Sequence, residues 1–413
     1  MRLLFVADYL PLQAPVAFRI HDFARFLTPL GVQISVVSRV DLLKILRIKA
    51  GEHYGSIKVY RALSLDVRLS EAIIDIFQLV STFLLSFFVA LHQKVDFVIV
   101  SVPPGVPSIG AFLAAKLLRK KTVIDVRDKW EDYSIQSSKY GIVRFTNRRL
   151  KELFSILLRK ADLVIGVTPS LVKDLKARGA SNAVFIPNGV DLNLFHPREP
   201  KEKLDLKSQL GLAKDEVVLV YTGGIGSYYR PDIAIEAMHN LSNNGNPDKL
   251  KFILIGGGEK SAVQKILKQV KSFKLQEKVI FFGKKPREFV ANLLPACDIG
   301  VVPFDDNPLW NCAQPTKFFE YCAIGLPSIV TVPPYSDLGK LVRDNQVGYV
   351  VKPMNTSEFE AALSDFCQKS YAERKKMGMN ARSLVQSHFD RQRLAQLLLE
   401  NLERLQNGQR RPK

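Results

Sequence analysis

Residues 315–321, with the sequence PTKFFEY, place a cation and a carboxylate near the predicted start of a helix. A helix that begins at Pro315 or Thr316 has free N–H groups and a positive dipole end, which together favour an anion. Lys317 adds a positive charge there, so these groups predict a diphosphate ligand. Glu320 lies one turn further along, where an ionised carboxylate accepts hydrogen bonds from two ribose hydroxyls. An ordinary helix with solvent-exposed Lys317 and Glu320 is the alternative.

A second group of polar residues closes an apolar run in the first half of the chain, with the sequence DVRDKW at residues 125–130. Because this run predicts a strand, we expect Asp128 and Trp130 at the edge of a sheet. A carboxylate in that place can orient or deprotonate the hydroxyl of an acceptor. An N-cap aspartate beside a packed tryptophan is the alternative. Arg19 is a candidate ligand for an anion on this acceptor side, with a surface ion pair as its alternative.

Motifs of several other enzyme classes are absent from the sequence. It contains no Asp-x-Asp pair, no G-x-x-x-x-G-K-[ST] loop and no Gly-x-Ser-x-Gly turn. A metal-dependent diphosphate site, a P-loop NTPase and a serine hydrolase are therefore not expected. The four cysteines have no paired or Cys/His ligand spacing, which argues against a structural zinc site and a disulfide scaffold. We expect no metal and no other cofactor.

Short apolar runs alternate with helical patterns along the whole chain, which is typical of parallel sheets covered by helices. The predicted strands of the first half are residues 3–7, 34–37, 57–60, 97–101, 122–126, 163–167 and 184–186. Those of the second half are residues 217–221, 252–255, 279–282, 299–302, 328–332 and 348–351. The sequence predicts an α/β fold of two doubly wound, Rossmann-like domains whose strand ends face each other across a cleft.

The two sets of strands are separated by residues 196–216, which contain two prolines and a run of charges typical of an interdomain linker. We predict an N-terminal domain over residues 1–195 and a C-terminal domain over residues 217–385. Leucines at helical spacing predict one more helix near the end of the chain. We expect residues 386–413, which contain this helix, to pack back on the N-terminal domain.

The net charge of the chain is +19, from 59 Lys and Arg against 40 Asp and Glu, and the excess is spread over both halves. Such a field attracts nucleic acid, anionic lipid headgroups or phosphorylated small molecules, and it also aids solubility. The sequence has no zinc finger and no RNP-type aromatic strand motif. We therefore expect no nucleic-acid partner.

The segment from Ile73 to Leu91 is apolar on nearly all sides and follows a stretch rich in basic residues. Its run between Asp75 and His92 is about 16 residues long, which is marginal against the roughly 20 residues of a typical transmembrane helix. Apolar and basic residues together suit the surface of an anionic membrane, with a buried core helix and a true span as alternatives. The apolar run at the start of the chain is too short for a signal peptide. We expect a cytoplasmic protein attached peripherally to the inner face of the cytoplasmic membrane.

The pattern PTKxxEYxAxGLP, at residues 315–327, resembles the donor-binding helix of glycosyltransferase family 4, whose members are retaining enzymes of the GT-B fold. Other segments resemble the same family in the same order along the chain. They are ADLV at 161–164, PNGVD at 187–191, YTGG at 221–224, IGGGE at 255–259 and FG at 282–283. The resemblance implies an acceptor-binding N-terminal domain and a C-terminal domain that binds a nucleotide sugar.

The resemblance also implies roles for single residues. Glu320 matches the second glutamate of a Glu-x7-Glu pattern and would bind the donor ribose. The implied donor-binding set is Gly223, Gly224, Gly283, Lys284, Pro286, Pro315, Thr316, Lys317 and Glu320. Arg230 is the candidate for a basic phosphate ligand, although YYRP at 228–231 replaces the usual Lys-Gly. Lys317 and Arg230 would neutralise the leaving diphosphate, and Asp128, beside Trp130, would act on the acceptor.

Cys312 stands where the family often has the first glutamate, which leaves the donor sugar unassigned. We predict a retaining glycosyltransferase that moves a sugar from a nucleotide-diphosphate sugar to a hydroxyl of a glycan or lipid-linked acceptor. Cell-surface polysaccharide, glycolipid or lipid-linked glycan synthesis is the expected setting. The alternatives are a catalytically weak donor-binding subunit that needs a partner and a nucleotide-sugar epimerase on the same fold.

Overall fold

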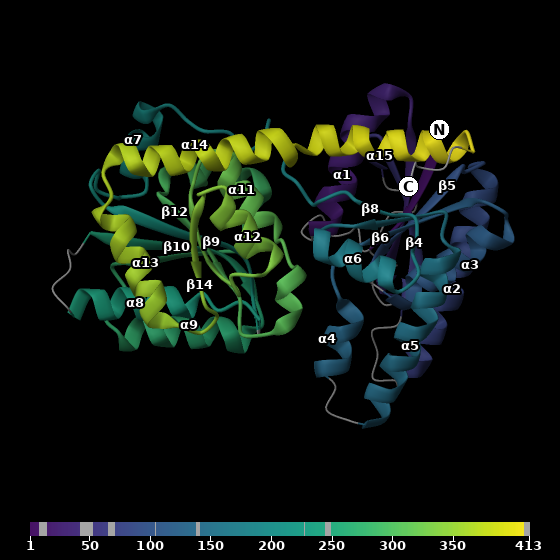
Figure 1. Cartoon of the computed structure of the whole chain (residues 1–413), viewed down its shortest axis with the longest axis horizontal. Helices are drawn as coiled ribbons and strands as arrows, with labels where there is room; N and C mark the ends of the chain where they lie inside the picture. Colours follow the sequence, from purple (N-terminus) through teal and green to yellow (C-terminus); the bar gives the residue numbers. More distant parts are fainter. Residues whose placement is uncertain are drawn as a thin grey trace. The chain divides into compact units, whose positions relative to one another are not determined.

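The chain folds as two compact units in a computed structural model (Figure 1). The structure describes residues 1–7, 15–41, 53–64, 71–103, 105–137, 141–226, 228–243 and 249–408. Unit 1 consists of Met1–Asn188 together with Arg391–Lys413, and unit 2 is Gly189–Asp390. Unit 1 is therefore built from two separate stretches of the sequence.

The sheet of unit 1 has eight strands in the order β3-β4-β2-β1-β5-β6-β7-β8. They are β1 (Arg2–Val6), β2 (Gln33–Asp41), β3 (His53–Tyr54), β4 (Ile57–Ser64), β5 (Phe97–Val102), β6 (Lys121–Val126), β7 (Leu163–Gly166) and β8 (Ala183–Phe185). All neighbours are parallel except β3, which pairs with β4 in the antiparallel sense. Every residue of the central strand β5 is buried, as expected for a parallel strand covered on both faces.

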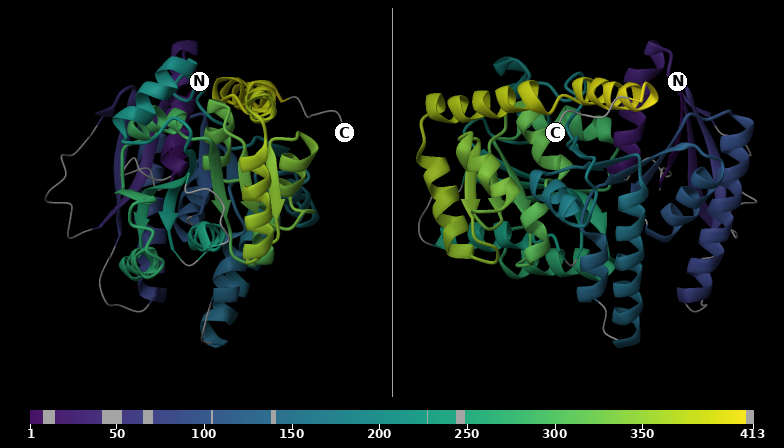
Figure 2. Two further views of the ribbon diagram at one scale, coloured as in Figure 1. Left: turned by 90° about the vertical axis from the view of Figure 1, so that its left-hand side faces the viewer. Right: turned by 45° about the vertical axis from the view of Figure 1, so that its right-hand side comes forward.

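Helices lie on both faces of this sheet (Figures 1 and 2). They are α1 (Pro15–Leu27), α2 (Glu71–His92), α3 (Gly105–Leu117), α4 (Trp130–Ser137), α5 (Gly141–Lys160), α6 (Pro169–Ala177) and α15 (Arg391–Gln406). Helix α15 packs beside α1 and places Leu394, Leu398 and Leu402 in the core with the strands of unit 1. Helix α5 extends past the edge of its sheet (Figure 2).

The sheet of unit 2 has six parallel strands in the order β11-β10-β9-β12-β13-β14. They are β9 (Val217–Ile225), β10 (Leu250–Gly258), β11 (Val279–Gly283), β12 (Ile299–Pro303), β13 (Ser328–Thr331) and β14 (Gly348–Val351). Alternate residues of β9 enter different cores: Val218 and Val220 join one cluster, and Leu219 and Tyr221 join another. The sheet is therefore covered on both faces, which is the arrangement of a doubly wound domain.

The helices of unit 2 follow its strands in alternation. They are α7 (Pro200–Gln209), α8 (Asp232–Asn243), α9 (Lys260–Ser272), α10 (Arg287–Leu293), α11 (Thr316–Ile324), α12 (Asp337–Asp344), α13 (Thr356–Gln368) and α14 (Tyr371–His388). Helix α7 lies within the predicted linker of residues 196–216 and is part of unit 2. Lys203 and Lys207 of α7 bind both oxygens of Asp298 at 2.8 and 2.9 Å, which ties this stretch to the sheet.

Each predicted strand coincides with a strand of the structure, to within a few residues at its ends. The predicted fold class, α/β with two Rossmann-like units, is confirmed. Strand β3 was not predicted, because two residues carry no periodic pattern. The structure ends the first unit at Asn188 rather than at 195, and returns to it at Arg391 rather than at 386.

Candidate functional site

The start of helix α11 is fixed against the sheet of unit 2 by an aromatic side chain. Pro315 is the N-cap residue, and the helix begins at Thr316, as the sequence predicts. The hydroxyl of Tyr321 accepts a hydrogen bond of 2.8 Å from the backbone N–H of Thr222 in β9. A Cβ at Gly300 would lie 2.2 Å from the Tyr321 ring, so only glycine lets the ring approach β12 this closely. Helix α11 is thereby held against β9 and β12 through Tyr321.

A close approach of backbone to backbone shapes the end of β9. Gly223 has a φ of +125°, which L side chains rarely adopt. A Cβ at the neighbouring Gly256 would lie 1.8 Å from the carbonyl oxygen of Gly223. Both Gly223 and Gly224 are exposed. The end of β9 at Gly223 and Gly224, which we call the Gly223 turn, therefore presents bare backbone, as a site that receives a phosphate group requires.

The side chain of Lys317 reaches from α11 to this turn. Its Nζ would lie 3.0 Å from a Cβ at Gly223. The residue is buried, and Nζ has no hydrogen-bond partner among the residues that the structure describes. Burial lowers the pKa of Lys317 well below its usual value, while the charge of Glu320 opposes this shift. A buried ammonium without a partner is costly, so this position favours an anion beside it.

Glu320, one turn further along α11, faces Arg287 at the start of α10. The distance between Oε1 of Glu320 and Nε of Arg287 is 3.7 Å, and both side chains are largely buried. The guanidinium of Arg287 lies over the ring of Phe195, 5.3 Å from its centroid. The sequence analysis missed Arg287. Its position directly after Pro286, in the segment predicted to lie beside the nucleobase, was the signal that could have found it.

The remaining glycine and lysine of the predicted donor set lie on the loop between β11 and α10. Gly283 ends β11 with a φ of +66°, a value that suits glycine. The side chain of Lys284 runs past Gly257, where a Cβ would lie 2.9 Å from Cγ of the lysine. Pro286 is the N-cap of α10. The loop therefore lies next to β10, the strand whose glycines pair with the end of β9.

Arg230, the predicted phosphate ligand, is held by its neighbours in the structure. Its Nε and Nη2 donate to the carboxylate of Asp232 at 2.9 and 2.7 Å. Its Nη1 lies 3.0 Å from the sulfur of Met354. The bond to Asp232 raises the pKa of Arg230. Its part in phosphate binding stays a prediction, because each terminal nitrogen already has a contact here.

An aromatic cluster lies between Arg230 and the loop that contains Cys312. Trp310 stacks on Phe304 at 5.2 Å and on Tyr228 at 5.3 Å, and its indole N–H donates to Asp305. Burial raises the pKa of the Asp305 carboxyl, although this hydrogen bond opposes the shift. The side-chain oxygen of Asn311 is buried and accepts no hydrogen bond from the described residues. It is an acceptor that sequence patterns did not single out.

In unit 1, Arg19 has a structural role. Its Nε and Nη2 donate to the two oxygens of Asp125 at 3.1 and 3.2 Å. Its Nη1 and Nη2 also donate to the carbonyls of Pro187 and Ile186. The side chain is 2 % exposed, so the ion pair is buried rather than on the surface. The guanidinium joins α1 to β6 and to the segment after β8, and its expected contact with an acceptor has no support in this geometry.

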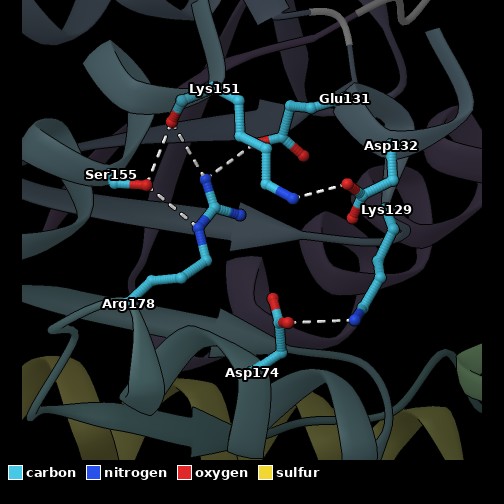
Figure 3. Close-up of polar contacts among 7 residues, drawn as sticks. All are labelled: Lys129, Glu131, Asp132, Lys151, Ser155, Asp174 and Arg178. Carbon is cyan, nitrogen blue, oxygen red and sulfur yellow. Dashed lines mark hydrogen bonds and ion pairs between the residues drawn. The ribbon is translucent and has the colours of Figure 1, made fainter. Parts of the chain in front are cut away.

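Asp128 follows β6 and is exposed, and Trp130 begins α4, with a side chain outside the described part of the structure. A network of ion pairs anchors this segment (Figure 3). Lys129 binds Asp174 at 2.9 Å, and Arg178 binds Glu131 at 3.0 Å. The network also contains an ion pair between Lys151 and Asp132 and a bond from Arg178 to Ser155. It fixes the backbone beside Asp128, and sequence patterns gave no signal for it.

Helix α2 contains the segment from Ile73 to Leu91 and presents one apolar side to solvent. Only 28 % of the window Ile73–His92 is buried, so the helix is not a core helix. By length and composition it is the one described helix that could cross a membrane. The exposed large side chains lie three or four residues apart. They are Ile73, Ile76, Val80, Leu84, Phe88 and Leu91, which we call the α2 stripe.

The structure thus brings Lys317 together with Gly223, and Glu320 together with Arg287, all in unit 2. Asp128 and Arg19 belong to unit 1, where they do not contact each other through any described hydrogen bond or ion pair. The donor-side prediction therefore forms a local cluster, whereas the acceptor-side prediction does not.

Comparison with known proteins gives a consistent family. The model described as Glycosyltransferase Family 4 matches residues 16–194, and the model described as Glycosyl transferases group 1 matches residues 202–384. The putative colanic acid biosynthesis glycosyl transferase WcaI of Escherichia coli K12 is 25 % identical over 62 % of this chain. The D-inositol 3-phosphate glycosyltransferase of Nocardia farcinica is 25 % identical over 43 %. The matches span 63 % and 38 % of the length of these relatives.

Solved structures agree on the fold over nearly the whole chain. Sucrose-phosphate synthase from Thermosynechococcus elongatus superposes with a TM-score of 0.80 at 17 % identity, covering 99 % of this chain and all of that one. Anabaena HepE in complex with UDP-glucose gives 0.73 at 18 % identity, covering 98 % and 99 %. Two family models that together span both units, and two parallel α/β sheets of this topology, lead to one conclusion: the chain belongs to glycosyltransferase family 4 and has the GT-B fold.

Proposed function

We propose that the protein transfers a sugar from a nucleotide-diphosphate sugar to a hydroxyl acceptor, with retention of the anomeric configuration. The observation that carries this proposal is the buried ammonium of Lys317, which lies without a hydrogen-bond partner in the described structure against the turn at Gly223. A diphosphate would supply the missing acceptor oxygens and the opposite charge. HepE, a structural neighbour, was solved with UDP and with UDP-glucose, which supports a nucleotide-sugar donor.

In this proposal, different groups of unit 2 bind different parts of the donor. Lys317 and the free N–H groups at the start of α11 bind the diphosphate and stabilise the negative charge that develops as it leaves. Gly223 and Gly224 allow the phosphates to approach the backbone. Glu320 accepts hydrogen bonds from the ribose, and Arg287 holds its carboxylate in place. We propose that these groups act without a metal cofactor.

The sugar would lie toward the loop that contains Cys312, since this loop follows β12 and leads directly to Pro315. The buried oxygen of Asn311 is suited to accept a hydrogen bond from a sugar hydroxyl. On the acceptor side we propose Asp128, an exposed carboxylate at the end of a strand, as the group that orients the attacking hydroxyl. The ion pairs of Figure 3 hold the backbone on its C-terminal side.

We propose that the acceptor is a glycan or a lipid-linked glycan, reached at the inner face of the cytoplasmic membrane. The relative WcaI is described as a colanic acid biosynthesis enzyme, which supports synthesis of a cell-surface polysaccharide. The α2 stripe supplies an apolar surface that the described structure leaves exposed. The segments after α2 and α3 line one depression of about 220 Å³ that carries Arg119, Lys120 and Lys121. Apolar and basic residues together suit anionic lipid.

The test of the donor site is the thermal stability of the purified protein with a panel of nucleoside diphosphates and nucleotide sugars, without metal. A ligand of the folded state raises the melting temperature by mass action. We expect one donor to stand out, and Lys317→Ala and Glu320→Ala to lose both its binding and sugar transfer. Lys340→Ala removes an exposed lysine of α12 and should change neither.

Four results would contradict parts of the proposal. Transfer at the normal rate in either site variant would refute the assigned site. If no ligand of the panel raises the melting temperature of a folded sample, donor binding is refuted. Binding of a nucleotide sugar without transfer to any acceptor would support a donor-binding subunit, and conversion of the donor without an acceptor would support an epimerase.

A further inference from the structure

The ammonium of Lys317 lies between two tyrosine rings. Its Nζ is 4.1 Å from the ring centroid of Tyr221 and 3.5 Å from that of Tyr229. The rings are 6.0 Å apart at their centroids and inclined by 63°. Tyr221 belongs to β9, and Tyr229 follows the turn after that strand. The two rings therefore come from sequence positions on either side of Gly223 and contact the same cation.

Both rings are held in place by other contacts. The hydroxyl of Tyr221 donates to the carbonyl of Gly224, so this ring is tied to the turn itself. The ring of Tyr229 packs on Phe304 at 5.0 Å and on Tyr228 at 4.6 Å. Since neither ring needs Lys317 to hold it in position, the two rings form a preorganised binding site for the ammonium.

The two aromatic rings suit an ammonium that must remain available to a phosphate ligand. The face of an aromatic ring carries partial negative charge and attracts an ammonium, most strongly where water is excluded. Unlike a carboxylate, it does not neutralise the ammonium or compete as an anion with a phosphate. The remaining charged group that acts on Lys317 is Glu320 on the same helix, which the ribose would engage. The N–H donors of Lys317 thus stay open to an incoming ligand.

The side chain of Arg230, the other cation near the Gly223 turn, has different contacts. Arg230, next to Tyr229 in the chain, directs its guanidinium to Asp232 and Met354. The segment that places Arg230 there also supplies Tyr229 to Lys317. Of these two neighbouring residues, it is therefore Tyr229 that contacts Lys317.

We propose that Tyr229, together with Tyr221, is a positioning residue that holds the ammonium of Lys317 against the Gly223 turn, ready for the diphosphate of the donor. The inference rests on the proposed function, because it assigns a partner to the cation of that same site. The inference predicts which side chains are tolerated at position 229. The position needs an aromatic face, and the tyrosine hydroxyl is dispensable.

The experiment compares Tyr229→Leu, Tyr229→Phe and the wild type by calorimetry and by NMR. The probes are UDP, GDP, ADP and dTDP, each with its parent nucleoside. We expect Tyr229→Leu to lower the affinity for the best nucleoside diphosphate by about tenfold or more, in line with the strength of a desolvated cation–π contact. The affinity for the nucleoside should stay unchanged, because it lacks the phosphates. Tyr229→Phe should restore binding of the diphosphate.

A matched control is Tyr371→Leu, which removes an exposed tyrosine ring at the start of helix α14. It should leave the ratio of diphosphate to nucleoside affinity as in the wild type. Melting temperatures of all variants show that they are folded. An undiminished diphosphate affinity in Tyr229→Leu, an equal loss for nucleoside and diphosphate, or no recovery in Tyr229→Phe would overturn the inference. Absence of binding by the wild type itself would instead overturn the proposed function and the inference with it.

Discussion

The α2 stripe predicts a measurable affinity for anionic membranes. Its six side chains are between 47 % and 65 % exposed. Full burial of a large aliphatic or aromatic side chain contributes about 1.5–3 kcal/mol. Covering the exposed half of each one would therefore contribute about 1 kcal/mol per residue. The triple change Ile76→Ser, Val80→Ser and Phe88→Ser removes about 3 kcal/mol, which corresponds to a decrease of about a hundredfold in the partition constant.

The assay is sedimentation with sucrose-loaded vesicles that contain phosphatidylglycerol, compared with vesicles of phosphatidylcholine alone. We expect the wild type to bind the anionic vesicles, and binding to weaken as salt screens the attraction. The triple variant should bind about a hundredfold more weakly at equal salt. Because all three positions are exposed, its melting temperature should stay close to that of the wild type.

The control variant changes three exposed apolar residues of unit 2, with the substitutions Leu204→Ser, Leu267→Ser and Met379→Ser. It loses a comparable apolar area away from α2 and should bind vesicles as the wild type does. If the control and the triple variant lose binding alike, the stripe is not the contact. If the triple variant binds as well as the wild type, the estimate from exposed area is refuted.

The remaining predictions concern the buried charges and the close backbone contact. Arg19→Met leaves the carboxylate of Asp125 buried without its partner, and should lower the free energy of unfolding by about 3–5 kcal/mol in urea. Lys317→Met should flatten the dependence of stability on pH. Burial lowers the pKa of Lys317, so between that value and the ordinary one the unfolded chain binds a proton that the folded chain releases. Wild-type stability therefore rises with pH in this window. Gly256→Ala forces a Cβ against the carbonyl of Gly223 and should destabilise the protein by about 1–3 kcal/mol while weakening diphosphate binding.

A different result would contradict each of these three predictions. If Arg19→Met unfolds at the wild-type urea concentration, the buried ion pair does not stabilise unit 1. If the rise of stability with pH persists in Lys317→Met, another group causes it. If Gly256→Ala is as stable as the wild type, the strands β9 and β10 separate at little cost. Gly211→Ala serves as its control, since no atom lies within 4 Å of a Cβ there, although its positive φ adds some strain.

The strands could be predicted from the sequence because their signal is local. A short apolar run between turn residues identifies a buried parallel strand wherever it occurs, and the runs led to strands in both units. The start of α11 could be predicted for the same reason, since a proline followed by a polar turn is a local signal. The donor side of the site depends mostly on this one helix and on glycine-rich strand ends.

The partners of the site residues could not be predicted, because they come from distant parts of the chain. Arg19 and Asp125 are 106 residues apart, and no periodic pattern connects them. Arg287 reaches Glu320 from another helix, and Asp232 binds Arg230 through a side-chain geometry that a sequence does not show. The apolar character of α2 was visible, whereas the side that it presents to solvent depends on how α3 packs against it.

The place of α15 in the core of unit 1 has a consequence for synthesis. Leu394, Leu398 and Leu402 pack with the strands that are made first. Arg391, at the start of this helix, forms a buried ion pair with Asp22 of α1. The ribosome therefore completes all of unit 2 before unit 1 has its last helix. A nascent chain therefore carries unit 1 without these core leucines until α15 has been made.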